Sequence, residues 1–502
     1  MKISNLKDEV WYGGLVAEGI HMPFRNRRVK ISKNMSENQA VPMLISNKGR
    51  YIYSEAGFDA EITEEFVNIE KNTEEVILNG DGSSLREALC NIKGRFAPQN
   101  GVYPAEILFR YPQYCTWIEL IYEQNQRDII RYAEDILKNG FPRGVIIIDD
   151  TWQTDYGVWE FNPERFSDPK GMVEKLHSMG FAVMLWICPF ISPDSMVFRE
   201  LRDKKLLVCD KDGEVAIRKW WNGYSAVLDF TNPEAVGWFE EKCGGLISEY
   251  GVDGFKFDAG DPIHYEDDDL CFCNTSANGQ SELYAKFGTR YAFNEYRSCF
   301  KCTEEGLVQR LSDKAHSWGE TGLAALVPNG IAAGLCGYPY VCPDMIGGGS
   351  FKDFTDGSDS LDEELVIRYA QCAALFPVMQ FSAAPWRVLS EFGAGCCRNA
   401  AELHIKYGDY IMEEVRKSAK TGEAILRHME YEFSNQGFEN ITSQYMLGSR
   451  ILVAPVLEKG KTTVDVVLPQ GKWRCGDGEV IDGGRTVEMP APLDTLLYFI
   501  KE

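Results

Sequence analysis

The 502-residue sequence is poor in histidine, short of basic side chains and without long apolar runs. Six histidines are a weak basis for transition-metal chemistry. Apolar runs such as FAVMLWICPF (181–190) are far shorter than the roughly 20 residues that cross a bilayer. Lysine and arginine number 52 against 75 acidic residues, and the net charge of −23 repels phosphate backbones and anionic lipids. We therefore expect a neutral substrate and neither a nucleic-acid nor a membrane partner.

The first residues show no apolar segment followed by a small-residue cleavage site, so we expect a cytoplasmic protein. Fifteen cysteines without an export signal then predict reduced thiols rather than a disulfide framework. Two cysteine clusters could together hold zinc, Cys271 with Cys273 and Cys299 with Cys302, but their combined spacing matches no standard zinc motif. Free thiols are the preferred interpretation, and we expect no metal and no cofactor.

The pattern of the chain changes twice and predicts three parts. Residues 1–104 show short alternating stretches separated by Gly, Asn and Ser, which predicts a β-sandwich-like domain. Residues 105–390 alternate apolar strands with helical segments, which predicts an α/β fold, a (β/α)8 TIM barrel with a small insertion near 191–225. Residues 391–502 predict a helical connector and a C-terminal β-domain. The expected barrel strands include 116–120, 144–150, 181–190, 254–260, 307–313, 337–345 and 378–383.

An open doubly wound sheet is the competing architecture for the middle part. Such sheets usually carry a G-x-G-x-x-G phosphate loop after the first strand, and the sequence contains none. The barrel is therefore favoured, with its active site at the carboxyl ends of the strands.

Carboxylates stand repeatedly at the expected strand ends: Asp149, Asp150, Asp258, Asp313 and Asp344. Buried carboxylates lose hydration energy unless they are paired or used. Three interpretations remain at this point: a Mg²⁺ or Ca²⁺ site, a general acid/base pair, or hydrogen bonding at strand ends.

Tryptophans in the same segments favour a sugar site, because aromatic faces suit the apolar C–H surfaces of sugar rings. Each alone would be interpreted as core packing, but five lie close to the acids: Trp117, Trp152, Trp186, Trp220 and Trp221. Lys256 precedes Asp258 by two residues and so shares its strand face, where it could keep that carboxylate ionised.

Four segments between residues 105 and 460 can be recognised together: FSDPKGMVEKLHSMGFAVMLWICPFISPDS (166–195), AVLDFTNPEA (226–235), GVDGFKFDAGD (251–261) and QYMLGSRILVAPV (444–456). With them, most of residues 105–460 resemble glycoside hydrolase family 31. GVDGFKFDAGD resembles the family's nucleophile motif. Arg297 and, sixteen residues later, Asp313 resemble its substrate-binding arginine and acid/base aspartate.

The resemblance implies an exo-acting α-glycosidase that retains anomeric configuration by double displacement. Asp258 would be the nucleophile, and Asp313 the general acid and base. The implied substrate-binding residues are Trp117, Asp149, Asp150, Trp186, Trp221, Lys256, Arg297 and Asp344. Catalytically inactive carbohydrate-binding proteins on this fold are the alternative of another class, and a metal-dependent hydrolase is a third. Both catalytic aspartates are present, which favours the enzyme.

Within the family, WYGG (11–14), KWWNG (219–223) and CPDMIGGG resemble an α-galactosidase-type branch. Ser382 stands near where many α-glucosidases have a histidine, and Asp150 where they often have an apolar residue. Asp149 and Asp150 together could accept hydrogen bonds from the axial 4-OH and from O6 of galactose. We therefore expect an α-galactosidase acting on small oligosaccharides or glycosides, with α-glucosidase and α-xylosidase as alternatives. The sequence leaves a homo-oligomer open.

Overall fold

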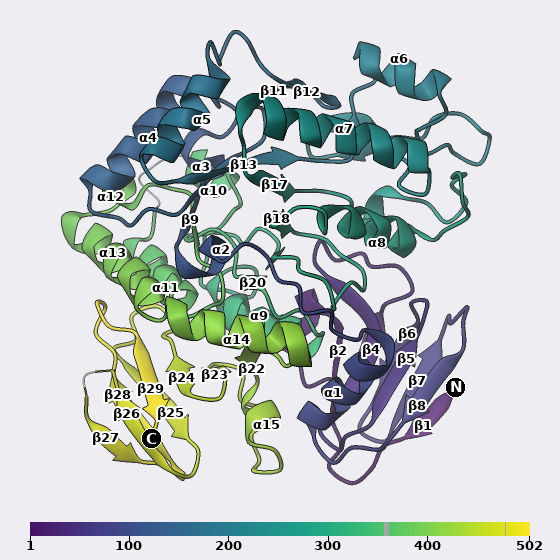
Figure 1. The fold of residues 1–502 in the computed structure, drawn as a ribbon. Helices are drawn as coiled ribbons and strands as arrows, with labels where there is room; N and C mark the ends of the chain where they lie inside the picture. The colour runs from purple at the N-terminus through teal and green to yellow at the C-terminus, as the bar shows by residue number, and fades with distance from the viewer. Residues whose placement is uncertain (356–360, 477) are drawn as a thin grey trace.

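A parallel eight-stranded barrel lies at the centre of the computed structural model, which describes residues 1–355, 361–476 and 478–502 (Figure 1). Its strands are β9 (Gln113–Cys115), β10 (Val145–Ile148), β13 (Ala182–Ile187), β17 (Gly254–Phe257), β18 (Phe293–Tyr296), β19 (Gln309–Arg310), β20 (Val341–Cys342) and β21 (Gln380–Phe381). They pair in the order β20-β19-β18-β17-β13-β10-β9-β21. Met345, just beyond β20, pairs in parallel with Gln380 of β21 and brings the two edges together. The predicted (β/α)8 fold is confirmed.

Helices follow most of the strands and surround the barrel (Figure 1). Asn125, Asp168 and Asn232 begin the first three by accepting a hydrogen bond from a backbone N–H of the first turn. Strands such as β10, Val-Ile-Ile-Ile, are buried along their whole length because helices cover the outside of the barrel. The helices are α4 (Gln126–Lys138), α5 (Pro169–Ser178), α7 (Pro233–Tyr250), α8 (Ala277–Gly288), α9 (Leu326–Leu335), α11 (Glu363–Ala373) and α13 (Glu391–Lys406).

Two details of the expected barrel were wrong. Residues 117–120 form a short helix, α3 (Trp117–Leu120), and the strand β9 ends immediately before it. Strand β18 was missed because the buried polar residues Asn294 and Glu295 occupy its centre. Polar side chains inside the barrel interrupt the apolar run by which buried strands are recognised.

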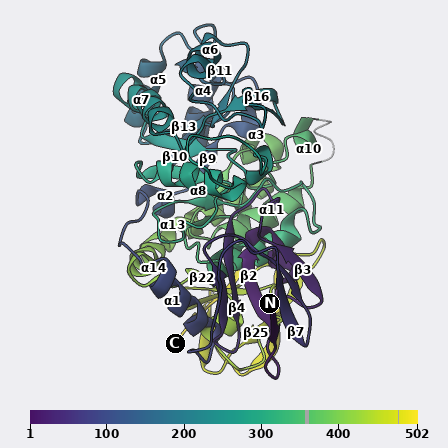
Figure 2. The ribbon, with the colours of Figure 1, turned by 90° about the vertical axis from the view of Figure 1, so that its right-hand side faces the viewer.

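The N-terminal part consists of two four-stranded antiparallel sheets followed by α1 (Leu85–Phe96). One sheet contains β1 (Lys2–Ser4), β7 (Phe66–Glu70), β6 (Asp59–Ile62) and β3 (Arg27–Lys30). The other contains β2 (Trp11–Leu15), β4 (Ala40–Ser46), β5 (Tyr51–Ser54) and β8 (Val76–Asn79). Figure 2 shows these strands below the barrel.

The connection between β3 and β4 reaches the active-site side of the barrel. Gln39 Nε2 donates to the backbone carbonyls of Arg297 and Arg310, both at 2.9 Å. Asn38 exchanges hydrogen bonds with Ser312, one to its hydroxyl and one from its backbone N–H, both at 2.8 Å. The N-terminal sandwich is therefore attached to two loops of the barrel mouth.

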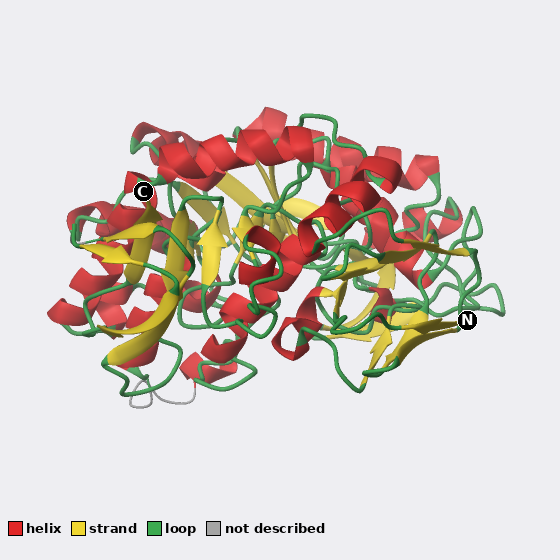
Figure 3. Cartoon of the chain, turned by 90° about the horizontal axis from the view of Figure 1, so that it is seen from below, coloured by secondary structure: helices red, strands yellow, loops and turns green. Residues whose placement is uncertain are grey.

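After α14 (Gly408–Thr421), the C-terminal part forms a six-stranded antiparallel sheet and a separate two-stranded sheet. The larger sheet contains β22 (Leu426–Arg427), β23 (Tyr445–Leu447), β24 (Ile451–Ala454), β29 (Leu497–Lys501), β26 (Lys472–Cys475) and β27 (Val480–Asp482), and the smaller contains β25 (Thr463–Leu468) and β28 (Arg485–Pro490). An apolar cluster around Trp473 packs between them. Figure 3 shows this part and the N-terminal sheets on opposite sides of the molecule.

A small sheet and α6 (Met196–Asp203) follow β13, in the region of the expected insertion. The sheet is antiparallel in the order β14 (Phe190–Ile191), β16 (Gly223–Val227), β15 (Ile217–Trp220). Gly223 has a φ of +103°, which favours glycine and lets the chain turn back directly after Asn222. No helix in the described part of the chain has the length and apolar character needed to cross a membrane.

Candidate active site

A cavity of about 400 Å³ opens at the carboxyl ends of the barrel strands. Every predicted site residue except Asp344 lines it, so the structure brings together side chains from the ends of six barrel strands and from the β15–β16 hairpin. Its predicted lining residues are Trp117, Asp149, Asp150, Trp186, Trp221, Lys256, Asp258, Arg297 and Asp313. Those that the sequence did not predict are Glu37, Arg310, Met345, Gly349, Ser350, Phe351 and Lys352.

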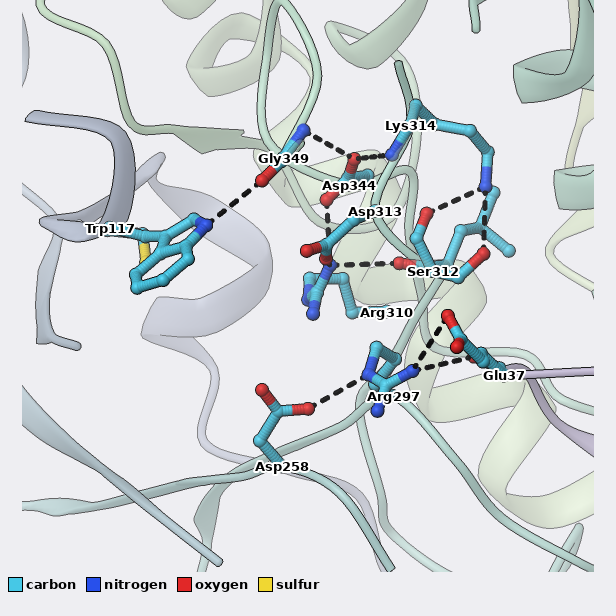
Figure 4. A network of polar contacts seen from close by, with 12 residues as sticks. Glu37, Trp117, Asp258, Arg297, Arg310, Ser312, Asp313, Lys314, Asp344 and Gly349 are labelled. Carbon is cyan, nitrogen blue, oxygen red and sulfur yellow. Dashed lines mark hydrogen bonds and ion pairs between the residues drawn. The ribbon is translucent and has the colours of Figure 1, made fainter. Parts of the chain in front are cut away.

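Asp258 directly follows β17 and is held by donors on both carboxylate oxygens. Arg297 Nε donates to Oδ1 at 2.9 Å (Figure 4), and Trp186 Nε1 donates to Oδ2 at 3.0 Å. Burial alone would raise the pKa of Asp258, but the nearby cations, Arg297 first, lower it below its ordinary value. The carboxylate is therefore ionised, as a nucleophile requires.

Lys256 has a different partner from the one the sequence suggested. Its Nζ lies 2.6 Å from Asp149 Oδ2, and both side chains are buried. Burial would lower the pKa of Lys256, but Asp149 raises it above the ordinary value. Lys256 contributes to the ionisation of Asp258 only through its charge, and Arg297 makes the direct contact. The expected Lys256–Asp258 pair is thus replaced by Lys256–Asp149.

Arg310, at the end of β19, joins Asp313 to Asp344 (Figure 4). One guanidinium nitrogen, Nη1, donates to Asp313 Oδ1 and to Asp344 Oδ1, both at 2.7 Å. The side chain of Asp313 is 43% exposed, while Arg310 is buried. Asp313 therefore accepts a hydrogen bond from the buried Arg310, while the rest of its carboxyl group is open to the cavity.

Asp344 was predicted to bind substrate, and this assignment is corrected by its position. Its carboxylate is fully buried and accepts from the backbone N–H of Lys314 at 2.7 Å and of Gly349 at 3.1 Å, besides Arg310. Burial raises its pKa, partly offset by Arg310. Asp344 lies behind the cavity wall, where it positions Arg310 and two loops.

Asp150 is surrounded by neutral donors. Tyr156 Oη lies 3.0 Å from Oδ2, Asn222 Nδ2 donates to Oδ2 at 2.7 Å, and Gln153 Nε2 donates to Oδ1 at 3.2 Å. Burial raises the pKa of Asp150 to about 7, although the hydrogen bonds from Gln153 and Tyr156 lower it and Asp149 adds to the rise. Asp150 can therefore exchange a proton near neutral pH.

Three of the five tryptophans line the cavity, and each does something different. Trp186 donates to Asp258, as described above. Trp117 donates from Nε1 to the carbonyl of Gly349 at 2.9 Å and presents its ring edge-on to Phe351. Trp221 is 46% exposed, with the Arg297 guanidinium 5.3 Å from its ring centroid. The other two, Trp152 and Trp220, are buried in aromatic packing and are not part of the site.

Sequence reasoning missed four residues that shape the site: Glu37, Tyr156, Asn222 and Arg310. Glu37 comes from the N-terminal domain, and its carboxylate lies 3.7 Å from Arg297. Asn222 was within the KWWNG segment, but nothing in the sequence linked it to Asp150. One feature of the sequence could have identified Arg310 as a site residue: it lies at a strand end, three residues before Asp313.

Ser382 does not line the cavity. Its buried hydroxyl accepts from the backbone N–H of Ile118 at 2.7 Å and so supports the helical turn that carries Trp117. All fifteen cysteines are free thiols. Within residues 1–355, 361–476 and 478–502, no group of three or more His, Cys, Asp or Glu side chains is arranged to hold a metal ion.

Comparison with known proteins gives consistent results. The model of the glycosyl hydrolases family 31 TIM-barrel domain matches residues 108–414, and that of the family 31 C-terminal domain matches residues 422–502. The myogenesis-regulating glycosidase of Mus musculus is 33% identical over 434 residues, which is 84% of this chain and 60% of that protein.

Two further relatives show how far sugar preference varies among similar proteins. The α-xylosidase XylQ of Lactiplantibacillus pentosus is 27% identical over 488 residues, covering 89% of this chain and 60% of the enzyme. The chain therefore spans about 60% of the length of these two curated relatives. A Flavobacterium johnsoniae GH31 dextranase complexed with glucose has the same fold, with a TM-score of 0.89 at 20% identity over 100% of this chain and 66% of that one.

Proposed function

Because the chain belongs to glycoside hydrolase family 31, we propose that it is an exo-acting retaining α-glycosidase with Asp258 as nucleophile and Asp313 as acid and base. The observation that carries the proposal is the environment of Asp258, whose pKa is lowered by Arg297 and the other cations despite burial. Two donors hold its oxygens at the cavity wall, and Asp313 lines the same cavity with an exposed carboxyl group.

In the first step, an Asp258 oxygen attacks the anomeric carbon while Asp313 protonates the departing glycosidic oxygen. The C–O bond to the aglycone breaks, and a covalent glycosyl ester with Asp258 forms. In the second step, Asp313 takes a proton from water, whose oxygen attacks the same carbon and releases Asp258. Arg310, which donates to Asp313, supports this base form. Two inversions at one carbon give net retention.

The stereochemistry tests this mechanism directly. Proton NMR of the first minutes of hydrolysis, before mutarotation, is expected to show the α-anomer of the released sugar. Early appearance of the β-anomer would mean inversion and would remove Asp258 from the nucleophile role. Absence of turnover on every α-glycoside tried would support instead an inactive carbohydrate-binding protein.

For the sugar, we propose an α-linked galactose. Asp149 and Asp150 line one part of the cavity together with Lys256, which makes this part rich in hydrogen-bonding groups. A sugar that lacks or misplaces a hydroxyl forgoes hydrogen bonds to these groups, and a hydrogen bond to a charged group contributes about 1.5–3 kcal/mol. The axial 4-OH of galactose, with O6, is the hydroxyl pair that we assign to this region.

A panel of p-nitrophenyl α-galactoside, α-glucoside and α-xyloside tests this choice. We expect the highest kcat/KM on the galactoside. In the variant Asp150→Ile, galactoside turnover is expected to fall about ten-fold or more beyond the fall for glucoside. A wild-type preference for xyloside, the sugar named for the XylQ relative, would replace galactose by xylose and leave the retaining mechanism unaffected.

A further inference from the structure

The turn of the β15–β16 hairpin, Trp221 and Asn222, contacts two opposite parts of the cavity, and we call these two residues the hairpin tip. The ring of Trp221 lies over the guanidinium of Arg297, which holds the nucleophile. The amide of Asn222 donates to Asp150 Oδ2 at 2.7 Å. Neighbouring residues of one turn therefore reach both the nucleophile side and the Asp150 side of the site.

The orientation of the Asn222 amide is fixed by three partners. Tyr122 Oη donates to its Oδ1 at 2.9 Å. Its Nδ2 donates to Tyr156 Oη at 2.6 Å and to Asp150, and Tyr156 in turn contacts both oxygens of Asp150. The ionised form of Asp150 can only accept hydrogen bonds, so the amide nitrogen faces Asp150 in that form. Tyr122, Asn222, Tyr156 and Asp150 form one continuous network.

Asp150 depends on these donors because it is buried and no cation in the described residues forms an ion pair with it. A buried carboxyl group without hydrogen bonds is strongly destabilised. The hairpin itself does not need Asn222 for packing, since its buried face is formed by Trp220 and Ser225 while Lys219 and Tyr224 face outward. The polar network is thus the main use of the Asn222 side chain.

We propose that Asn222 is a positioning residue for sugar selection, which orients the carboxyl group of Asp150 and holds Trp221 across the cavity. The inference rests on the proposed glycosidase function, and it assigns sugar preference to a residue outside the eight barrel strands. An Asn222→Ala variant would release both the Asp150 carboxyl group and the hairpin tip. Binding of the preferred sugar is then expected to weaken at least about five-fold, because hydrogen bonds to charged groups are among the stronger ones.

Calorimetric titration of the full chain with galactose, glucose and xylose tests the proposal without requiring turnover. Asn222→Ala is expected to weaken binding of the sugar that the wild-type protein binds best. It is also expected to reduce the preference of the protein for this sugar over the other two. Tyr122→Phe removes the hydroxyl that orients the amide, so it is expected to act in the same direction but less. The double variant should be less than additive, since both changes affect one network.

Tyr224→Ala is the matched control, because Tyr224 is on the same hairpin, 63% exposed and outside the network. It is expected to leave affinities and thermal unfolding temperature unchanged. A second readout is pH. Because the hydrogen bond from Asn222 favours the ionised carboxylate, removing it is expected to raise the pKa of Asp150 and to shift the pH dependence of binding upward. The other titratable groups facing Asp150 are Asp149, Tyr122, Tyr156 and Cys188.

Affinities and preference within two-fold of wild type in a folded Asn222→Ala protein would overturn the inference alone. An equal effect of Tyr224→Ala would also overturn it, since the hairpin rather than the network would then be responsible. If wild type prefers glucose or xylose, the galactose proposal fails while the Asn222 effect is measured on the preferred sugar. If no sugar binds, the proposed function and the inference fail together.

Discussion

Asp149 and Asp150 are adjacent in the chain, yet of these two carboxyl groups only that of Asp149 has a cation of the described residues at ion-pair distance. Lys256 Nζ lies 2.6 Å from Asp149, whereas the partners of Asp150 are neutral. Two carboxyl groups at one strand end therefore have different electrostatic environments. Asp149 is paired with the buried Lys256, whereas burial raises the pKa of Asp150 to about 7. Such a pair can present an acceptor and a donor to a sugar at the same time.

The first prediction concerns Asp258. Asp258→Asn keeps the size of the side chain but removes the nucleophilic oxygen, so kcat is expected to fall at least about 10³-fold. Azide is expected to restore part of the turnover of Asp258→Ala, in which space for the anion is available, and to yield a β-glycosyl azide. Substantial activity in the asparagine variant, with circular dichroism unchanged, would refute the assignment.

The second prediction concerns Asp313. Asp313→Asn removes proton donation, and kcat on sugar-leaving substrates is expected to fall about 10²- to 10⁴-fold. Glycosides with good leaving groups need less protonation, so glycosyl fluoride or p-nitrophenyl substrates should form the glycosyl ester at a less affected rate. Pre-steady-state release of p-nitrophenol measures this step. An equal loss for good and poor leaving groups would contradict the acid role.

The third prediction is a pH dependence of stability. The folded pKa of Asp150 is about 7 against an ordinary value of 3.8, so the folded state retains a proton that the unfolded chain loses between these values. The stabilising contribution of this proton is present below pH 4 and disappears as the pH rises to 7. One pKa unit corresponds to about 1.4 kcal/mol, which gives an upper limit of about 4 kcal/mol.

Urea unfolding at several pH values tests this expectation against the non-titrating variant Asp150→Asn. The wild-type free energy of unfolding is expected to fall relative to that of the variant between pH 4 and pH 7. Other titrating groups, such as His404 and His428, are present in both proteins and cancel in the difference. Parallel curves across this range would mean that Asp150 is not a proton-binding group of the folded state.

The fourth prediction concerns Asp344, which is expected to stabilise the fold rather than to take part in the reaction. Asp344→Ala leaves Arg310 with one buried partner fewer and two backbone N–H groups unpaired, so unfolding is expected to become about 3–5 kcal/mol easier. Asp409→Ala is the control, because the Asp409 side chain is 91% exposed, and it should change stability by less than about 1 kcal/mol. A fully stable Asp344→Ala protein would show that Arg310 does not need this partner.

The sequence was informative where a strand is long and apolar, and less so elsewhere. Strands β10, β13 and β17 are runs buried on both sides, and they were found near their predicted places. Strand β18 has polar side chains inside the barrel and was missed, whereas β19 to β21, of two residues each, lie within longer predicted segments. The barrel was therefore predictable as a pattern, although strand β18 and the bounds of the short strands were not.

The same contrast applies to the site. Acids at strand ends were predictable because parallel strands end at one edge. The partner of Lys256 was not, since Asp149 and Asp258 both end nearby strands and the sequence gives no distances. Asn222 lies 72 residues from Asp150, and their contact depends on how a hairpin outside the barrel folds back. The roles of the nine predicted residues that line the cavity remain predictions.

The hydrogen bonds of Gln39 to the carbonyls of Arg297 and Arg310 bear on how this protein can change over evolution. An insertion or deletion in the connection between β3 and β4 would displace Arg297 and Arg310, which donate hydrogen bonds to Asp258 and Asp313. The sandwich cannot be exchanged between relatives as an independent module, because its exchange would leave two buried carbonyls unpaired beside the chemistry. Recombination at the boundary near residue 104 should therefore give a folded protein with an intact site only between parents that share this connection. The first domain and the barrel are thus expected to evolve together.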